Sequence, residues 1–138
     1  MSSLQALDTN YILALTDPRQ EASEKARAVM DPFLEPVVPC IAYGEAWHGL
    51  CRGRPDKTAK KRKKFEEYIA PLRVLWLDQE TLKRFHDLSW TLARKGSPLP
   101  GNDVWIAALC LQHDALVITI DSDFKHVPGL QVRSWETH

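Results

Sequence analysis

The strongest constraint on the fold is that short apolar runs alternate with helix-like segments along the whole chain. Runs at Leu4–Leu7, Val74–Leu77 and Leu116–Ile120 predict buried strands, and Val37–Val38 and Leu130–Val132 predict shorter ones. Apolar spacing predicts a short helix from Thr9 that stops near Asp17-Pro18, and further helices at 21–30, 41–51, 58–69, 81–95 and 102–113. Such alternation is typical of a parallel sheet covered on both faces. We therefore expect an α/β fold, a three-layer sandwich with a mostly parallel central sheet.

Length and charge narrow the class of protein further. The 138 residues are 44% hydrophobic and 26% charged, which predicts one globular domain spanning 1–138. The 18 Lys and Arg balance 18 Asp and Glu, which excludes a uniformly basic nucleic-acid coat but leaves room for a local basic patch. No apolar run approaches the about 18 residues of a transmembrane helix, and the amino terminus lacks signal-peptide features. We expect a cytoplasmic protein without membrane association.

Four acidic residues stand where ligands bind in such folds. Asp8 directly follows the first predicted strand, and Asp121 follows the strand Leu116–Ile120. Because ligands bind beyond the carboxyl ends of parallel strands, both carboxylates are expected at one edge. Asp103 starts one apolar helix and Glu45 lies one turn into another, where an ionised carboxylate is costly unless it is paired, hydrogen-bonded or metal-bound. Clustered carboxylates favour Mg²⁺ or Mn²⁺, which promote phosphodiester hydrolysis.

Each of these acids also has a purely structural interpretation. Asp8 is a suitable N-cap for the helix that begins at the next residue. Asp103, or Asn102 before it, is suited to capping its own helix. Asp121 and Asp123 both fit a turn after a strand. The placement of several acids at strand-to-helix junctions, rather than any one of them, favours a functional site.

Two other metal chemistries fit less well. Glu45 and His48 form an E-x-x-H pair, which resembles half of a carboxylate-bridged di-iron site, but the chain has no second such half. A phosphotransfer receiver would also bind magnesium near Asp8. Its usual pair of acids is missing, because only Gln5, Ala6 and Leu7 precede that residue in the strand.

Four short motifs, taken in order, resemble those of a PIN domain. They are Leu7-Asp8-Thr9-Asn10, Tyr43-Gly44-Glu45-Ala46, Asn102-Asp103-Val104-Trp105-Ile106-Ala107-Ala108 and Thr119-Ile120-Asp121-Ser122-Asp123-Phe124. The chain is most similar to VapC-type toxins of bacterial toxin–antitoxin pairs, and the resemblance extends to Val127-Pro128-Gly129-Leu130.

The resemblance implies a metal-dependent endoribonuclease with a parallel sheet between helices. It implies that the catalytic, metal-binding acids are Asp8, Glu45, Asp103 and Asp121. Thr9 or Asn10, together with Thr119, are the implied supporting polar residues, and Asp123 is the alternative to Asp121 as the fourth acid. The resemblance further implies a homodimer and a cognate antitoxin protein as partner.

A basic segment follows the second acidic motif. Its eight basic residues are Arg52, Arg54, Lys57, Lys60, Lys61, Arg62, Lys63 and Lys64, with Asp56 as the single acid. One interpretation is a solvated helical face. The other is an RNA phosphate-binding surface beside the acidic site. No aromatic residue lies within the segment, so we do not expect base stacking there.

The acidic residues and the resemblance together predict hydrolysis of RNA with one or two Mg²⁺ or Mn²⁺ ions, which would polarise the scissile phosphate and activate water. The alternative is a non-catalytic RNA-binding or adaptor protein of the same fold, against which the intact acidic set argues. An antitoxin is expected to insert an Arg among the acids. It is also expected to fill an apolar groove between the helical segments Ile12–Leu15 and Ile41–Leu50.

Overall fold

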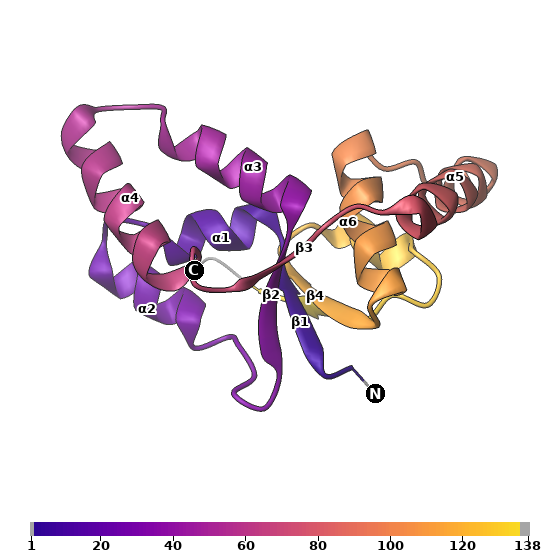
Figure 1. Ribbon diagram of the computed structural model, residues 1–138, viewed down its shortest axis with the longest axis horizontal. Helices are drawn as coiled ribbons and strands as arrows, with labels where there is room; N and C mark the ends of the chain where they lie inside the picture. Colours follow the sequence, from indigo (N-terminus) through magenta and orange to yellow (C-terminus); the bar gives the residue numbers. More distant parts are fainter. Residues whose placement is uncertain (1, 136–138) are drawn as a thin grey trace.

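A five-stranded parallel sheet forms the centre of the molecule in the computed structural model, which describes residues 2–135 (Figure 1). The strands are β1 (Leu4–Leu7), β2 (Glu35–Pro39), β3 (Arg73–Leu75), β4 (Ala115–Thr119) and β5 (Val132–Ser134). Their order is β3-β2-β1-β4-β5, and every neighbouring pair is parallel. The predicted α/β architecture with a parallel sheet is confirmed.

Helices cover both faces of this sheet. On one side lie α1 (Thr9–Leu15), α2 (Gln20–Arg27), α3 (Cys40–Leu50) and α4 (Pro55–Tyr68). On the other side lie α5 (Gln79–Arg94) and α6 (Gly101–Gln112) (Figure 1). A 3₁₀ helix, η1 (Ser122–His126), follows β4. Among the described residues, no helix has the length and apolar character needed to cross a membrane.

The sheet reverses its direction of growth at β1. The chain first builds outward from β1 through β2 to β3, then crosses to place β4 on the other side of β1. Leu7 pairs with Ile118, and the Asp8 amide donates to the Ile118 carbonyl at 3.2 Å. In open parallel sheets, a reversal of this kind leaves a crevice at the carboxyl ends of the two adjacent strands. Asp8 lies at that point.

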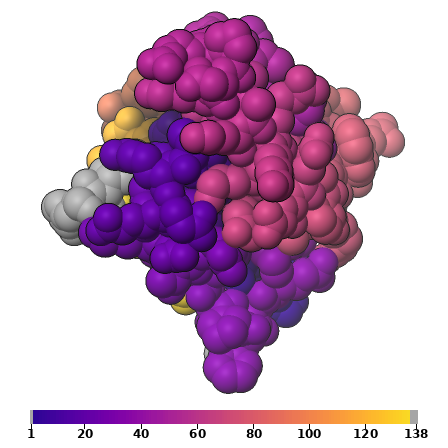
Figure 2. Space-filling view, turned by 90° about the vertical axis from the view of Figure 1, so that its left-hand side faces the viewer, coloured from indigo at the N-terminus to yellow at the C-terminus, as the bar shows by residue number. Residues whose placement is uncertain are grey.

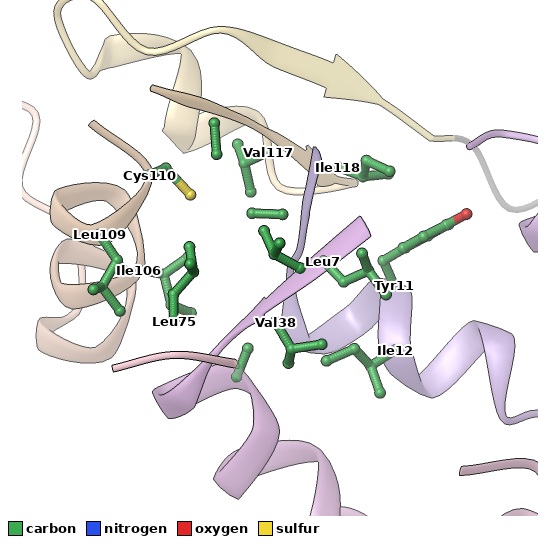
Figure 3. Packing of buried hydrophobic residues seen from close by; sticks show 14 of the residues in the cluster. Leu7, Tyr11, Ile12, Val38, Leu75, Ile106, Leu109, Cys110, Val117 and Ile118 are labelled. Carbon is green, nitrogen blue, oxygen red and sulfur yellow. The ribbon is translucent and has the colours of Figure 1, made fainter. Parts of the chain in front are cut away.

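The core is formed on both faces by apolar side chains of the flanking helices. Figure 3 shows Ile106, Leu109 and Cys110 of α6 on one side of the strands and Tyr11 and Ile12 of α1 on the other. All five side chains are fully buried. The almost unbroken apolar sequence of α6 agrees with a helix that is buried nearly all round.

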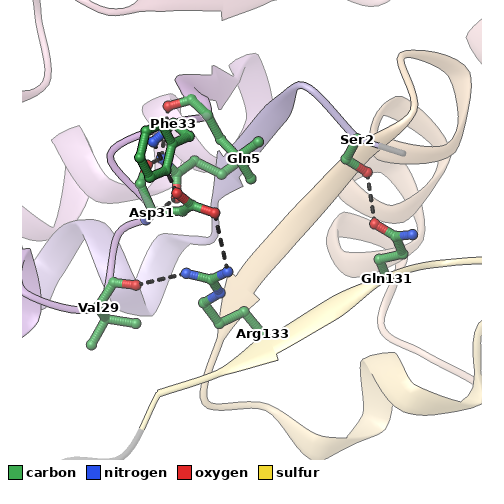
Figure 4. Close-up of polar contacts among 8 residues, drawn as sticks. Ser2, Gln5, Val29, Asp31, Phe33, Gln131 and Arg133 are labelled. Atoms are coloured by element: carbon green, nitrogen blue, oxygen red, sulfur yellow. Dashed lines mark hydrogen bonds and ion pairs between the residues drawn. The ribbon is translucent and has the colours of Figure 1, made fainter.

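A network of hydrogen bonds anchors the loop between α2 and β2 to the sheet. The buried Gln5 amide donates to the carbonyls of Asp31 (2.7 Å) and Leu34 (3.0 Å) and accepts from the Asp31 amide (2.9 Å). Arg133 of β5 donates to the Val29 carbonyl at 3.1 Å (Figure 4). The loop is therefore fixed to two strands, and it holds Phe33 at its tip 93% exposed.

The bounds of four of the five strands differ from the prediction, and β5 and β3 show the reason most clearly. β5 begins at Val132 because a turn occupies the preceding residues, with Gly129 at φ 79° and the Leu130 amide bonded to the Val127 carbonyl. β3 ends at Leu75, and the apolar run continues past it as the exposed Trp76. In both places the apolar run includes residues whose backbone does not pair in the sheet.

Candidate active site

Asp8 acts both as a helix cap and as the buried acid of the site. It ends β1, and its Oδ1 accepts from the Thr9 amide at 2.8 Å, which caps α1. Its Oδ2 accepts from the Thr119 hydroxyl of β4 at 2.6 Å. Burial raises the pKa of Asp8, the two threonine hydrogen bonds oppose that rise, and repulsion from Asp121 and Glu45 adds to it. The structural and functional interpretations of Asp8 are therefore compatible.

Glu45 joins helices from opposite faces of the sheet. It lies in the second turn of α3, and its Oε1 accepts from the Thr9 hydroxyl at 2.8 Å. Its Oε2 accepts from the Asn102 side-chain amide at 3.1 Å. Thr9 thus touches the candidate site, whereas its neighbour Asn10 is exposed. The sequence pattern indicates only a capping role for Asn102, because its partner lies 57 residues away.

The segment after β4 separates the two acids that the sequence left as alternatives. The Asp121 amide donates to the Thr119 hydroxyl at 3.0 Å, and the Asp121 carboxylate caps η1 by accepting from the Asp123 amide at 2.9 Å. Asp121 is half-buried and raises the pKa of Asp8. Asp123 is exposed and lies further out on η1. Asp121 therefore does both: its carboxylate caps the turn, and it interacts with Asp8.

Asp103 is repelled by the negative charges of the other acids in the site. It lies in the first turn of α6 and is partly buried. Its pKa is raised to about 6, first by burial and then by repulsion from four carboxylates: Asp8, Asp121, Glu45 and Asp123. A shift with these causes shows that the acids form one electrostatic cluster, even though they come from four separate segments.

The cluster is an open set of oxygen donors rather than a closed cage. Within residues 2–135, no three Asp, Glu, His or Cys side chains are arranged as a ready-made metal group. Hydrogen bonds from Thr9, Asn102 and Thr119 hold Glu45 and Asp8 in their positions. Oxygen-only donors suit hard divalent cations such as Mg²⁺ and Mn²⁺. The nearby His48 contacts Arg52 at 2.8 Å, so its pairing in the structure offers no support for a di-iron half-site.

The basic segment forms α4 and the turn before it, on the surface seen in Figure 2. Lys57, Lys60 and Lys63 are exposed, whereas Lys64 is half-buried and donates to Gln20 of α2 at 2.9 Å. Arg62 stacks over Trp47 of α3, 5.4 Å from the ring centroid. In Figure 1, α3 lies between α4 and α6. The structure therefore does not bring the basic residues into the acidic cluster; they form a separate face beyond α3.

The two helices between which an apolar groove is expected, α1 and α3, pack against each other, while Leu13 and Trp47 on them are each 37% exposed. Ile12 and Leu15 of α1 and Leu50 of α3 are buried in the core. The two helices pack closely, and a Cβ added at Gly49 would lie 3.4 Å from the Leu13 side chain. The sequence pattern identified apolar faces correctly, but these faces are used for core packing. Docking of an antitoxin segment between these helices stays a prediction.

The fold and the site define an α/β protein with an acidic edge at the reversal point of a parallel sheet. Residues 6–130 match the PIN domain family, and this chain belongs to it. It is 25% identical to the Ribonuclease VapC1 of Haemophilus influenzae over 130 residues, which are 94% of this chain and 96% of that protein.

Solved structures agree with this assignment. VapBC-1 from nontypeable Haemophilus influenzae superposes with a TM-score of 0.75 at 25% identity, covering 96% of this chain and 98% of the other. VapBC2 from Rickettsia felis, solved with a promoter DNA fragment, has a TM-score of 0.82 at 18% identity, covering 96% and 99%. The second likeness concerns the fold alone.

Proposed function

We propose that this protein is an endoribonuclease that hydrolyses RNA phosphodiester bonds with the help of Mg²⁺ or Mn²⁺. The observation that carries the proposal is the electrostatic coupling of Asp8, Glu45, Asp103 and Asp121 at one edge of the sheet. Such a concentration of negative charge is unfavourable without a cation. Similarity to a ribonuclease along nearly the whole chain supports the same activity.

In this proposal the four acids hold the metal through their carboxylate oxygens. When bound, such an ion would supply Lewis-acid activation of the scissile phosphate and of the attacking water. The hydroxyls of Thr119 and Thr9 orient Asp8 and Glu45, and Asn102 fixes the second oxygen of Glu45. With a pKa of about 6, Asp103 is mostly ionised above neutral pH and is then available as a ligand. No side-chain nucleophile is required.

The test is a cleavage assay on total RNA with the purified chain. We expect fragments in MgCl₂ or MnCl₂, none in EDTA, and recovery when the metal is restored in excess. Binding of RNA without cleavage in either metal would instead support the non-catalytic RNA-binding or adaptor alternative. The Asp103→Asn variant is purified identically and assayed in the same buffers. If this variant is inactive, a contaminating nuclease does not account for the cleavage.

We further propose that a small antitoxin restrains this activity. Several proteins with the same fold were solved as VapBC complexes, and one is described as a member of the VapBC family of toxin–antitoxin systems. The acidic cluster would attract an inserted Arg, which forms bidentate bonds with carboxylates. Co-expression with the adjacent reading frame should yield a complex in which RNA cleavage is blocked. Purification of this chain alone, with harmless expression of an active enzyme, would refute the toxin role and leave the nuclease role intact.

A further inference from the structure

A cavity of about 250 Å³ lies between the α5–α6 loop and η1. It is lined by Gly96, Ser97 and Pro98 of the loop and by Asp123 and His126 of η1. Typical small-molecule sites measure roughly 300–1,000 Å³, so this cavity suits one small group rather than an extended ligand. Of these five residues only Asp123 has been considered above, as the alternative to Asp121, and none belongs to the four acids of the proposed metal site.

Both walls of the cavity are fixed by hydrogen bonds. Gly96 has φ 73° and ends α5 in a Schellman turn, in which the Ser97 amide donates to the Leu92 carbonyl at 3.0 Å. Lys95 donates to the His126 carbonyl at 3.1 Å, which ties the loop to η1. On the η1 side, Phe124 is fully buried and anchors the 3₁₀ turn. The cavity is therefore formed before any ligand arrives, which lowers the cost of binding.

The cavity adjoins the acidic cluster on both of its walls. The loop continues from Pro98 into the first turn of α6, which carries Asp103. On the other wall, Asp123 follows Asp121 by two residues, and its charge contributes to the raised pKa of Asp103. An RNA strand whose phosphate lies at the acidic edge therefore has an adjacent nucleotide within reach of the cavity.

The lining chemistry favours a base over a phosphate. The five lining residues include no Lys or Arg, and the Asp123 carboxylate repels phosphate. His126 offers an aromatic face of the kind on which unpaired RNA bases stack. Within the described residues no hydrogen bond or ion pair engages the Asp123 carboxylate, so both oxygens are open to N–H donors. Among the four RNA bases only guanine presents two adjacent donors, N1–H and the 2-amino group.

We propose that this cavity is a base-recognition site for an unpaired guanine beside the scissile phosphate, with Asp123 accepting from N1–H and the 2-amino group and His126 stacking on the ring. The proposal rests on the ribonuclease function proposed above. It assigns specificity to residues that lie outside the four acids, and it predicts that the enzyme cuts next to guanine in single-stranded RNA.

The experiment uses fluorescein-labelled uridine decamers with one central guanosine, inosine, adenosine or cytidine. Fluorescence anisotropy in EDTA measures binding, and gel analysis in MnCl₂ locates cleavage. The guanosine decamer should bind about 10-fold more tightly than the inosine decamer, which lacks the 2-amino group, and it should be cut next to the guanosine. Asp123→Asn should remove this advantage, and His126→Ala should weaken binding of every decamer.

The matched controls are Asp87→Asn and His86→Ala, two exposed positions on α5 that should change neither measurement. Equal binding and unselective cutting of all four decamers by the unmodified protein would overturn the guanine proposal and leave the ribonuclease function standing. Loss of cleavage by Asp123→Asn with an unchanged guanine preference in binding would also overturn it, because Asp123 would then serve the chemistry. Failure of the unmodified protein to cut any RNA would refute the proposed function itself.

Discussion

Asp103 is the residue whose proposed metal-binding role conflicts most directly with the stability of the fold. Its pKa is raised to about 6 by burial and by the surrounding acids, so at neutral pH its charge destabilises the metal-free fold. Asp103→Asn should therefore stabilise the metal-free protein by about 1 kcal/mol, since solvent screens a partly exposed group, and raise Tm by about 3 °C. Thermal denaturation in EDTA measures this, with Asp87→Asn as the control. A lower Tm for Asp103→Asn would contradict the account.

The same residue predicts a pH dependence of defined sign. Because the folded pKa of Asp103 lies above its ordinary value of 3.8, the folded state binds more protons than the unfolded state between those values. Its contribution therefore destabilises the fold as pH rises from about 4 to about 6. In metal-free protein, the Tm advantage of Asp103→Asn should grow over this window and level off above pH 7. An advantage that shrinks with rising pH would show that the residue is favourably paired.

Some properties of single residues could be predicted from the sequence, and others could not. Asp8 was predictable because it directly follows a strand and precedes a helix, two local signals. The partners of Glu45 could not be derived from spacing, since Thr9 and Asn102 come from helices on opposite faces of the sheet. The sequence contains no signal for His126, because its proposed role depends on a contact between η1 and the α5–α6 loop.

Among the elements, the end of α5 depends on one glycine. Gly96 has φ 73°, a left-handed conformation that costs a residue with a Cβ roughly 1 kcal/mol. Gly96→Ala should therefore lower the free energy of unfolding by about 1 kcal/mol in urea denaturation. Gly44→Ala is the matched control, because Gly44 lies inside α3 with open space around it, and it should stabilise by about 0.5–1 kcal/mol. The two changes should thus have opposite signs, and equal signs would contradict the assigned backbone conformations.

The exposed face of α4 provides a prediction about RNA binding. Lys57, Lys60 and Lys63 point to solvent, unlike Lys64, which bonds to Gln20. If this face binds phosphates, replacing the three exposed lysines by Ala should reduce the slope of log K against log salt by about 2, or roughly 0.7 for each lost contact. Lys83→Ala on α5 should leave the slope unchanged. A slope that the triple variant does not alter would identify α4 as a solvated face.

Element boundaries were predictable where local chemistry fixes them. The helix beginning at Thr9 and the first strand were both located correctly, because a capping Asp separates them. η1 was missed, since its 3₁₀ turn depends on the Asp121 cap and on burial of Phe124 rather than on a periodic pattern. The position of α4 beyond α3 was also not derivable, because the sequence specifies the charge of a helix but not its neighbours.

For the whole molecule, the expected homodimer has a candidate surface on α5. Leu82 and Trp90 of this helix are 55% and 62% exposed, and such apolar exposure is typical of protein interfaces. Trp90→Lys should therefore shift the protein from dimer to monomer in light scattering at micromolar concentration. Phe33→Ser, at a still more exposed aromatic on the distant α2–β2 loop, should leave the dimer intact. The opposite outcome would place the interface at the loop.

The most direct test of the whole account is the initial rate of cleavage of a single-stranded RNA as MnCl₂ is added to metal-free protein. If the acids at the sheet edge are the catalytic centre, the rate should rise to saturation for the unmodified chain and for Asp87→Asn. It should fall at least about 100-fold at every metal concentration for Asp103→Asn, which remains folded. Metal-dependent cleavage that Asp103→Asn retains in full would contradict the claim that this acidic edge is the active site.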